Sequence, residues 1–183
     1  CACLVGSEMC IRDRMIIPHG NDCLLPYDNA YFIGAPENIE KFSQGMAESS
    51  TRHIKKAIVI GAGRTGTALA PMLEADGISV KVIDLDPEQC RHISSKLKKS
   101  IVLCGDGADI DLLMQEGVSE ADVVICTTKD ERLNLLVALL ARHLGAKKTI
   151  VRVVRGEYAD LMTQVGVDIA LSVRLLAAGE VLS

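Results

Sequence analysis

The sequence predicts an α/β fold: a doubly wound parallel sheet of six strands, preceded by a small β-rich fragment. From Lys55 onward, short apolar runs alternate regularly with helical segments, which is the order typical of a parallel sheet covered by helices. The apolar runs are continuous and β-branched, so we expect strands buried on both faces. A glycine-rich turn follows the first of these runs and opens the first helix.

The elements follow one another in a simple order. The expected strands are Ala57–Ile60, Ser79–Asp84, Ile101–Cys104, Val123–Thr127, Thr149–Val154 and Asp168–Leu171. The expected helices are Thr65–Ala75, Pro87–Leu97, Asp109–Glu116, Glu131–Leu144 and Glu157–Val165, with a further helix after Leu171. Proline suits the first turn of the second helix, and Gly145 and Gly166 follow the ends of the last two complete helices.

The chain before Lys55 has a different character. Residues 1–42 contain short β-type runs, "MIIPHG" and "AYFIGA", separated by the turn-rich "NDCLLPYDN". Ser43–His53 has the small and charged composition of a linker. We therefore expect three parts: a β-rich fragment at 1–42, a linker at 43–53 and an α/β domain at 54–183.

Composition excludes several classes of protein. The 183 residues are 49% apolar and carry a net charge of −4, so the chain can form a core and lacks the basic footprint of a nucleic-acid-binding protein. No apolar run reaches the roughly 18 residues of a membrane span. The first residues lack the basic start and apolar stretch of a signal peptide. We expect a soluble, cytoplasmic protein.

The seven cysteines and four histidines predict no metal site. There is no C-x-x-C pair, and no histidine falls at ligand spacing with the thiols. Cys104 and Cys126 lie inside strand-like runs, where cysteine behaves as a small apolar residue. We expect reduced cysteines with a structural role.

The turn after the first strand has the spacing of a Rossmann-type phosphate loop. Gly61, Gly63 and Gly66 follow a strand and open a helix, as the G-x-G-x-x-G motif of dinucleotide-binding folds requires. The first glycine permits a tight turn, the second lets the backbone approach a pyrophosphate, and the third allows close helix packing. Asp84 ends the next strand, where a carboxylate accepts hydrogen bonds from a ribose diol. The alternative is that these glycines serve packing alone.

Two further loops follow later strands at the same edge of the predicted sheet. Asp106 lies between two glycines after the third strand. The fourth strand is followed by Thr127, Thr128, Lys129, Asp130 and Asn134. These positions surround the topological switch point, where open α/β sheets bind ligands. Helix capping is the alternative for Asp106, as it is for Asp109 and Asp130, because each precedes a helix.

The sequence does not supply the groups that an oxidoreductase needs beside its cofactor. Tyr158 is followed four places later by Met162 rather than lysine, and His92 and His143 lie on expected helices. Cys126 is a possible nucleophile, but no histidine partner is evident in the sequence. We therefore expect no enzymatic activity, with an NAD-dependent dehydrogenase fragment as the alternative.

Several segments together resemble a known family. They are "KKAIVIGAGRTGTALAPMLEADGISVKVIDLDPEQC", "VLCGDGADIDLL", "ADVVICTTKDERLNLLVALLARHLGAKKTIVRVV" and "VGVDIALSVRLLAAGEVL". They are similar to the nucleotide-binding RCK/KTN domain of Trk-type potassium-uptake regulatory proteins. The segment "IRDRMIIPHGNDCLLPYDNAYFIGAPENIEKF" looks like the tail of a preceding RCK C-terminal domain.

The resemblance implies a cytoplasmic regulatory subunit that senses a nucleotide and gates a potassium transporter subunit in the membrane. The ligand would be NAD(H), with ATP or ADP as the alternative. A structural assembly domain without a ligand is a further possibility. The residues expected at the nucleotide are Gly61, Gly63, Arg64, Thr65, Gly66, Asp84, Leu85, Asp106, Thr127 and Thr128, with Arg64 reaching a terminal phosphate and Asp106 near the adenine. Some relatives have a cation-binding glutamate where this chain has Thr163, so no metal site is implied.

The apolar character of two helices predicts self-association. The helix at residues 131–144 has one face with Leu133, Leu136, Val137, Leu140 and Leu144 and another with Leu135, Ala138 and Leu139. A doubly wound sheet covers one face of such a helix, so a surplus apolar face indicates an interaction site. The segment 172–183 is also rich in leucine. Since the family pairs through these two helices, the resemblance implies a homodimer or a larger ring.

Overall fold

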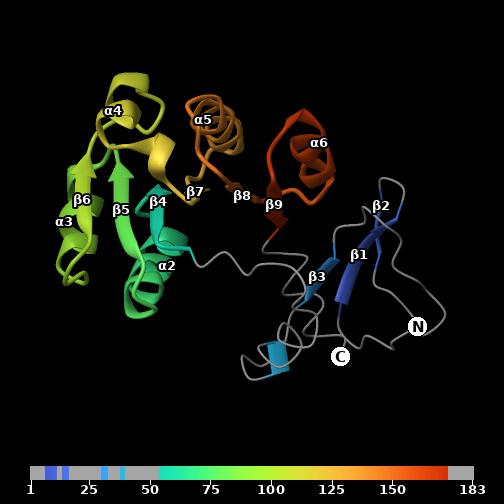
Figure 1. Ribbon diagram of the computed structural model, residues 1–183, viewed down its shortest axis with the longest axis horizontal. Helices are drawn as coiled ribbons and strands as arrows, with labels where there is room; N and C mark the ends of the chain where they lie inside the picture. Colours follow the sequence, from blue (N-terminus) through green and yellow to red (C-terminus); the bar gives the residue numbers. More distant parts are fainter. Residues whose placement is uncertain (1–6, 12–13, 17–29, 33–37, 40–53, 173–183) are drawn as a thin grey trace. The chain divides into compact units, whose positions relative to one another are not determined.

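The computed structural model describes residues 7–11, 14–16, 30–32, 38–39 and 54–172. The chain divides into two compact units, and each is described by itself. One unit holds a small sheet near the N-terminus, and the other holds the α/β domain (Figure 1). Among the helices of the described residues, none combines the length and apolar character needed to cross a bilayer.

The small sheet has three antiparallel strands in the order β2-β1-β3. These strands are β1 (Ser7–Ile11), β2 (Arg14–Ile16) and β3 (Ala30–Phe32). The second and third fall at the β-type runs predicted from Met15 and Ala30. The first was not predicted, because "SEMCI" holds a serine and a glutamate and lacks the β-branched pattern of a strand signal.

The larger unit contains the predicted six-stranded parallel sheet, so the doubly wound fold is confirmed. Its strands are β4 (Lys56–Ile60), β5 (Ser79–Asp84), β6 (Ile101–Cys104), β7 (Val123–Cys126), β8 (Thr149–Val153) and β9 (Ile169–Ser172). They lie in the order β6-β5-β4-β7-β8-β9. The chain therefore builds outward from β4 in one direction and then returns to the other side of β4, which creates a switch point between β4 and β7.

Five helices connect these strands within the described residues. They are α2 (Arg64–Ala75), α3 (Pro87–Ser94), α4 (Ile110–Gln115), α5 (Glu131–His143) and α6 (Glu157–Val165). A 3₁₀ turn at Val118–Glu120 was not predicted. The second of these helices ends three residues before the predicted Leu97, because the Ser95 hydroxyl donates a hydrogen bond to the His92 carbonyl (2.8 Å) and competes with the helical pattern. The helix predicted after Leu171 lies outside the described residues.

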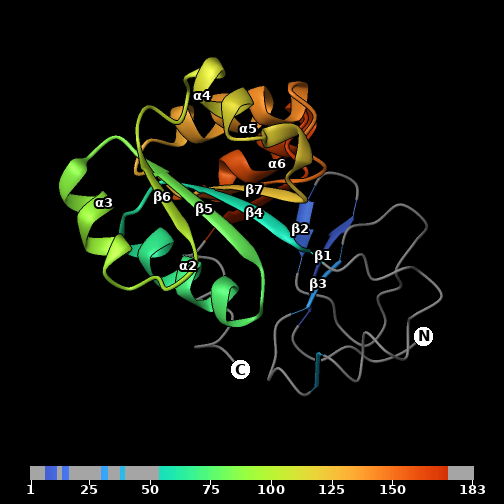
Figure 2. The ribbon, with the colours of Figure 1, turned by 60° about the vertical axis from the view of Figure 1, so that its left-hand side comes forward.

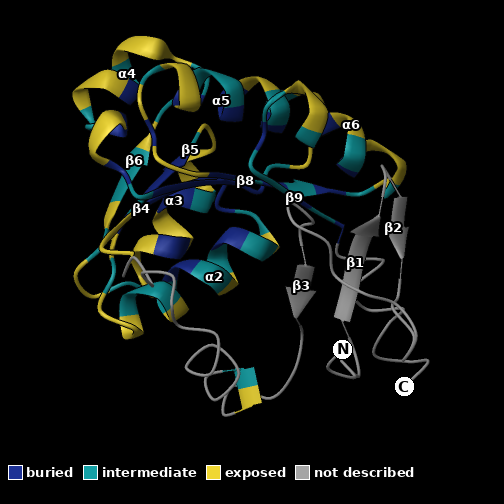
Figure 3. Ribbon diagram, turned by 45° about the vertical axis from the view of Figure 1, so that its right-hand side comes forward, coloured by how far each residue is buried: buried dark blue, intermediate teal, exposed yellow. Residues whose placement is uncertain are grey.

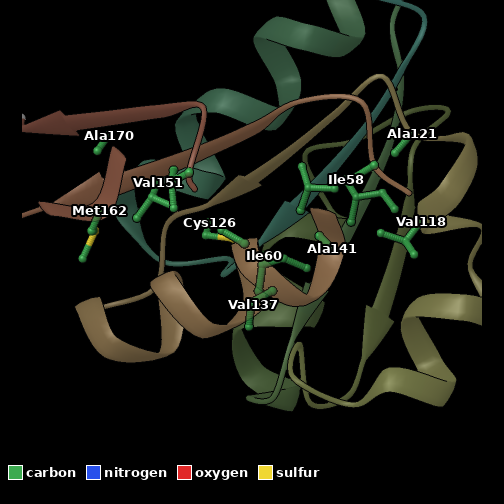
Figure 4. Packing of buried hydrophobic residues seen from close by; sticks show 14 of the residues in the cluster. Ile58, Ile60, Val118, Ala121, Cys126, Val137, Ala141, Val151, Met162 and Ala170 are labelled. Carbon is green, nitrogen blue, oxygen red and sulfur yellow. The ribbon is translucent and has the colours of Figure 1, made fainter. Parts of the chain in front are cut away.

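Helices cover both faces of the sheet (Figure 2), and buried apolar clusters hold these layers together. Alternate residues of β4 enter opposite clusters, since Val59 packs with residues of α2 and α3 while Ile58 and Ile60 pack with residues of α4, α5 and α6. Figure 3 shows the central strands buried between the two helix layers. Figure 4 shows the larger cluster, in which Cys126 and Val151 of the sheet face Val137 of α5.

The structure divides the surface of α5 differently from the prediction. Val137 and Ala138, which were assigned to separate faces, are both fully buried against the sheet. Leu139 is half-buried and packs on the same cluster, whereas Leu136 keeps 50% of its surface exposed. The apolar surface that this helix leaves uncovered is therefore smaller than the sequence predicted. The other predicted contact segment was 172–183; Ser172 ends β9, and the remaining residues of that segment lie outside the described residues.

Glu74 joins the end of α2 to the loop before β6. Its carboxylate accepts hydrogen bonds from the backbone N–H groups of Lys98 (2.9 Å), Lys99 (2.9 Å) and Ser100 (2.7 Å), and from the Ser100 hydroxyl (2.5 Å). These bonds, the Ser100 hydroxyl first among them, lower the pKa of Glu74 from 4.5 to about 2. The ionised carboxylate of Glu74 thus holds the turn at residues 98–100 in place.

The lowered pKa of Glu74 predicts a component of acid destabilisation. Because the folded state favours the ionised form, this contribution is present above about pH 4.5 and is lost as the pH falls towards 2. We expect the urea midpoint of the native chain to fall more steeply over this range than that of Glu74→Gln. Glu88→Gln, at an exposed glutamate of α3, is the control and should keep the native slope. Equal slopes for all three proteins would contradict the assignment.

Candidate functional site

The carboxyl ends of the central strands meet at one edge of the sheet. Ile60 at the end of β4 is in register with Ile83 of β5 on one side and with Cys126 of β7 on the other. The N–H of Gly61 donates to the Ile83 carbonyl (2.8 Å), and the N–H of Thr127 donates to the Ile60 carbonyl (2.8 Å). The glycine loop and the loop after β7 therefore lie side by side across the switch point.

Packing explains two of the three glycines. Gly61 has a φ of 101°, and a Cβ there would lie 2.9 Å from the backbone N of Thr128. A Cβ on Gly66 would lie 1.9 Å from the Gly61 carbonyl oxygen, so α2 can approach the loop this closely only with glycine at that position. A Cβ on Gly63 would meet nothing within 4 Å. The packing alternative therefore accounts for Gly61 and Gly66 but leaves Gly63 unexplained.

Helix α2 begins differently from the other helices of the described residues. Its N-cap is Gly63, which provides no side-chain bond, and its first turn contains no acidic residue. By contrast, α3, α4 and α5 begin with the aspartates Asp86, Asp109 and Asp130, each of which accepts backbone N–H bonds. Free N–H groups and the helix dipole make such a start attractive to an anion. The exposed side chain of Arg64 adds a positive charge there, and Thr65 is half-buried beside it.

Asp84 links the glycine loop to the loop after β5. Its Oδ2 accepts a hydrogen bond from the N–H of Ala62 (2.5 Å), and its Oδ1 accepts one from the N–H of Asp86 (2.8 Å). Each carboxylate oxygen retains a further lone pair for an outside donor. The next residue, Leu85, is 70% exposed and offers an apolar surface beside the carboxylate. This pair of residues suits the sugar and the base of a nucleotide.

Asp106 has a local structural role and remains exposed. Its Oδ1 accepts a hydrogen bond from the N–H of Ala108 (2.9 Å), which closes the turn before α4. A Cβ on Gly107 would lie 2.5 Å from the Ile60 side chain, so this turn is tightly packed against β4. Capping by Asp109 and Asp130 is confirmed by their bonds to the first N–H groups of α4 and α5. For Asp106 the turn bond and a ligand contact are compatible, because Oδ2 has no such bond within the described residues.

The two threonines after β7 support the site from within the protein. Thr127 is buried, and its hydroxyl donates to the Gly61 carbonyl (2.9 Å), so it fixes the glycine loop rather than facing outward. The Thr128 hydroxyl donates to Oδ1 of Asn134 (2.6 Å). Thr128 also presents its backbone N–H to the same oxygen (2.9 Å). Both predicted residues thus lie at the switch point, but their polar atoms are already engaged.

Asn134 was predicted to lie around the switch point but not to contact the nucleotide, and Arg152 was not predicted at this site. Asn134 is fully buried on α5, and its Nδ2 donates to the carbonyls of Thr128 and Arg152 (3.1 Å each). Arg152, half-buried on β8, donates from a guanidinium nitrogen to the Thr128 carbonyl (3.3 Å), while its Nε has no partner within the described residues. An arginine within the apolar run "TIVRVV" was the available signal for this buried network.

Cys126 is unsuited to act as a nucleophile in this structure. It is fully buried, and burial raises its pKa to about 12, so the thiol stays protonated at neutral pH. No group of three or more histidine, cysteine or acidic side chains in the described part of the chain could hold a metal ion.

A cleft of about 280 Å³ opens at the opposite, amino edge of the sheet. Two ion pairs line it, Lys56–Glu120 (2.5 Å) and Lys81–Glu116 (2.9 Å). Because each lysine is paired with a glutamate, the cleft presents little free charge to a ligand. Parallel sheets bind ligands at the carboxyl ends of their strands, so we place the functional site at the glycine loop.

Comparison with known proteins identifies the family. The family described as the TrkA-N domain matches residues 57–173. The chain belongs to this family. A Trk system potassium uptake protein trkA homolog 1 from Methanosarcina mazei is 35% identical over 181 residues, covering 98% of this chain and 44% of the relative. The chain therefore spans less than half the length of that relative, and the family resemblance read from the sequence is confirmed.

Several solved structures share the fold. The GsuK channel is similar with a TM-score of 0.66 and 22% identity, over 98% of this chain and 32% of that one. GsuK bound to NAD has a TM-score of 0.57 and 16% identity, over 73% and 25% of the two chains. The Kef CTD of Shewanella denitrificans in its AMP-bound form has a TM-score of 0.57 and 22% identity, over 68% and 75%.

The contrast between two glycines predicts a large loss of stability at one position and a small loss at the other. Gly66→Ala should lower the free energy of unfolding by about 3 kcal/mol or more, because its Cβ would overlap the Gly61 carbonyl. Gly63→Ala should cost less than about 1 kcal/mol, because its Cβ enters open space at a helix N-cap. Urea unfolding of both variants beside the native chain measures the difference. A Gly66→Ala protein as stable as Gly63→Ala would refute the packing argument.

Proposed function

We propose that this chain is part of a regulatory subunit of a Trk-type potassium uptake system, in which the α/β domain binds NAD(H) or an adenine nucleotide. The bound nucleotide changes the contact with a membrane transporter subunit and thereby gates potassium uptake. The names of the relatives support potassium transport as the setting. In this proposal residues 54–183 form the nucleotide-binding domain on the cytoplasmic side, 43–53 form a linker, and 1–42 form the tail of a preceding RCK C-terminal domain.

The open space at Gly63 is the observation that carries the proposal. A side chain there would project from the start of α2 without meeting the protein, so packing gives no reason for glycine at this position. A pyrophosphate lying against the backbone does give a reason. The helix start offers it N–H groups without a competing acidic cap, and Arg64 supplies a charge for a terminal phosphate.

The remaining groups fit the rest of a nucleotide. Asp84 accepts hydrogen bonds from the ribose hydroxyls, and the exposed side chain of Leu85 covers one side of the sugar and base. Asp106, in the exposed loop between β6 and α4, faces the adenine in this proposal. Thr127 and Thr128 hold the loops in place through their bonds to Gly61 and Asn134. Sensing needs only such binding contacts and no acid–base pair.

Two alternative functions, a dehydrogenase fragment and a structural domain without a ligand, are distinguished by different measurements. A dehydrogenase fragment would oxidise NADH in the presence of small carbonyl compounds, which the loss of NADH fluorescence measures. A structural domain without a ligand would give no heat on titration with NADH, NAD, ATP or ADP. The NAD-bound form of GsuK and the AMP-bound form of the Kef CTD support the sensing function, and they leave open which adenine nucleotide this chain prefers.

Asp84 predicts discrimination between the two nicotinamide dinucleotides. Its carboxylate accepts from a free 2′-hydroxyl and repels a 2′-phosphate, so NADPH should bind more weakly than NADH. Asp84→Ala should weaken NADH binding by about 10- to 100-fold, the loss of a hydrogen bond to a charged group. Isothermal titration measures both effects. Asp109→Ala is the matched control, since Asp109 caps α4 and should leave the affinity unchanged. Tighter binding of NADPH than of NADH would overturn the role of Asp84.

We further propose that the chain forms a two-fold symmetric homodimer, or a larger ring, through α5 and the segment at 172–183. Among the large apolar residues of α5, Leu136 is the exposed one, with 50% of its surface accessible. On α6, Leu161 and Val165 are also half-exposed and lie one turn apart on the same face. Such residues are suited to a contact with a second copy, and hinge motion across it would carry the nucleotide signal to the transporter.

Leu136 provides the test of this assembly. Leu136→Glu should raise the dissociation constant of the dimer by about 10-fold or more, because it places a charge within an apolar contact. Met72→Glu is the matched control, since Met72 is 65% exposed on α2, on the opposite face of the sheet. Light scattering over a range of micromolar concentrations gives the oligomeric state of each protein. A native chain that stays monomeric throughout this range would remove the proposed dimer.

A further inference from the structure

Two cysteines lie against the strand end that carries Asp84. Cys104 is the last residue of β6 and is paired in register with Asp84, while Cys90 lies on α3. Val82 and Val102 pack in the cluster formed by α2 and α3, and side chains two residues apart point to the same face of a strand. Cys104 therefore faces the layer that contains α3 and Cys90.

The two thiols bond to successive carbonyls at the end of β5. Cys90 Sγ donates to the Asp84 carbonyl (3.3 Å), and Cys104 Sγ donates to the Leu85 carbonyl (3.8 Å). Cys90 is also 3.6 Å from the Leu103 carbonyl, directly before Cys104 in the chain. Cys90 is buried and Cys104 is exposed. One thiol is thus open to solvent, and the other lies behind it.

Burial is the main cause that raises the pKa of Cys90, and the neighbouring Cys104 thiol adds to the rise, which brings the pKa to about 11. Neither cysteine takes part in the nucleotide contacts described above. They are therefore available for chemistry of their own.

We propose that Cys90 and Cys104 form a redox-active dithiol, which a small-molecule disulfide oxidises to an intramolecular disulfide, and that this closure weakens the adjacent ribose site. The first part stands on the placement of the two thiols alone. The second part rests on the proposed nucleotide function.

The oxidation proceeds in two balanced exchange steps. The exposed Cys104 thiolate attacks one sulfur of the small disulfide RSSR, forms a mixed disulfide and releases one RS⁻, which takes up a proton. Cys90 then loses its proton and attacks the Cys104 sulfur, which releases the second RS⁻. The protein loses two electrons and two protons, and RSSR becomes two RSH. Burial of Cys90 keeps most of its thiol protonated at neutral pH, which slows the second step.

Formation of the Cys90–Cys104 disulfide changes the hydrogen bonds that hold Asp84. A disulfide has no S–H group, so the Asp84 and Leu85 carbonyls both lose a donor. The bond also draws the two sulfurs to about 2.05 Å apart, which shifts α3 relative to β6. Asp86, the first capping residue of α3, donates its N–H to the Asp84 carboxylate (2.8 Å). Formation of the disulfide therefore displaces the backbone N–H of Asp86, which holds the Asp84 carboxylate in place for the ribose.

The test uses the full chain, first reduced and then equilibrated with oxidised glutathione. Free thiols are blocked with N-ethylmaleimide, and peptide mass spectrometry maps the disulfides. We expect a Cys90–Cys104 link in the native chain and its absence in Cys104→Ser, which would instead leave Cys90 alkylated after unfolding. Cys126→Ser is the matched control, since Cys126 is buried in the cluster on the opposite face of the sheet and should leave the link intact. Failure to find this link, or pairing of Cys104 with another cysteine, would overturn the proposal.

Titration with NADH then measures the coupling. Oxidation should raise the NADH dissociation constant of the native chain by about threefold or more, the effect of losing weak hydrogen bonds near the site, and should leave that of Cys104→Ser unchanged. An unchanged affinity after complete closure would refute the coupling. If the reduced chain binds no NADH, the proposed function fails, whereas the disulfide map still decides the dithiol. In that case amide exchange at Ala62 and Asp86 reports whether closure loosens their bonds to Asp84.

Discussion

The close approach of α2 to the loop that precedes it is the constraint on which the site depends. The Gly66 backbone lies so near the Gly61 carbonyl that no side chain fits between them. The same carbonyl accepts the buried hydroxyl of Thr127, so the loop is held between a helix and a neighbouring strand end. This contact fixes the orientation of α2, so that the N–H groups of its first turn lie at the switch point. A looser loop would leave its N–H groups pointing elsewhere, and the phosphate site would be lost even with all three glycines present.

The charges along this edge direct a ligand into one orientation. Three aspartates, Asp86, Asp109 and Asp130, cap the helices on either side and satisfy their first N–H groups. Within the described residues, α2 alone lacks both a side-chain cap and an acidic residue in its first turn, since α6 has Glu157 and Asp160 there. In the proposed complex, phosphate would therefore be attracted to α2 and repelled by the neighbouring carboxylates. The sugar hydroxyls, which donate hydrogen bonds, would then lie at Asp84.

Sequence reasoning predicted the elements with strong periodic signals and missed what depends on distant contacts. The strands Ser79–Asp84 and Ile101–Cys104 have the predicted bounds, because continuous β-branched runs have few other uses. The role of Thr127 was not predictable in the same way. A threonine after a strand looks the same whether its hydroxyl faces a ligand or a carbonyl, and here the carbonyl comes from 66 residues earlier in the chain. The buried bonds of Asn134 depend on Thr128 and Arg152 in the same manner.

Asp84 connects the binding edge to the interior of the domain. Its side chain holds Ala62 in the glycine loop, while its carbonyl accepts bonds from Gly105 (2.9 Å) and from the Cys90 thiol. A ligand that draws the carboxylate outward would therefore pull on the loop after β6 and on α3 together. Helix α3 and helix α4, which follows this loop, are short, with eight and six residues, so little intrinsic helix stability resists such a shift. The central strands have no comparable freedom, because they are buried on both faces. Movement in response to a nucleotide should therefore occur in α3 and in the loops that follow β5 and β6, while the central strands stay fixed.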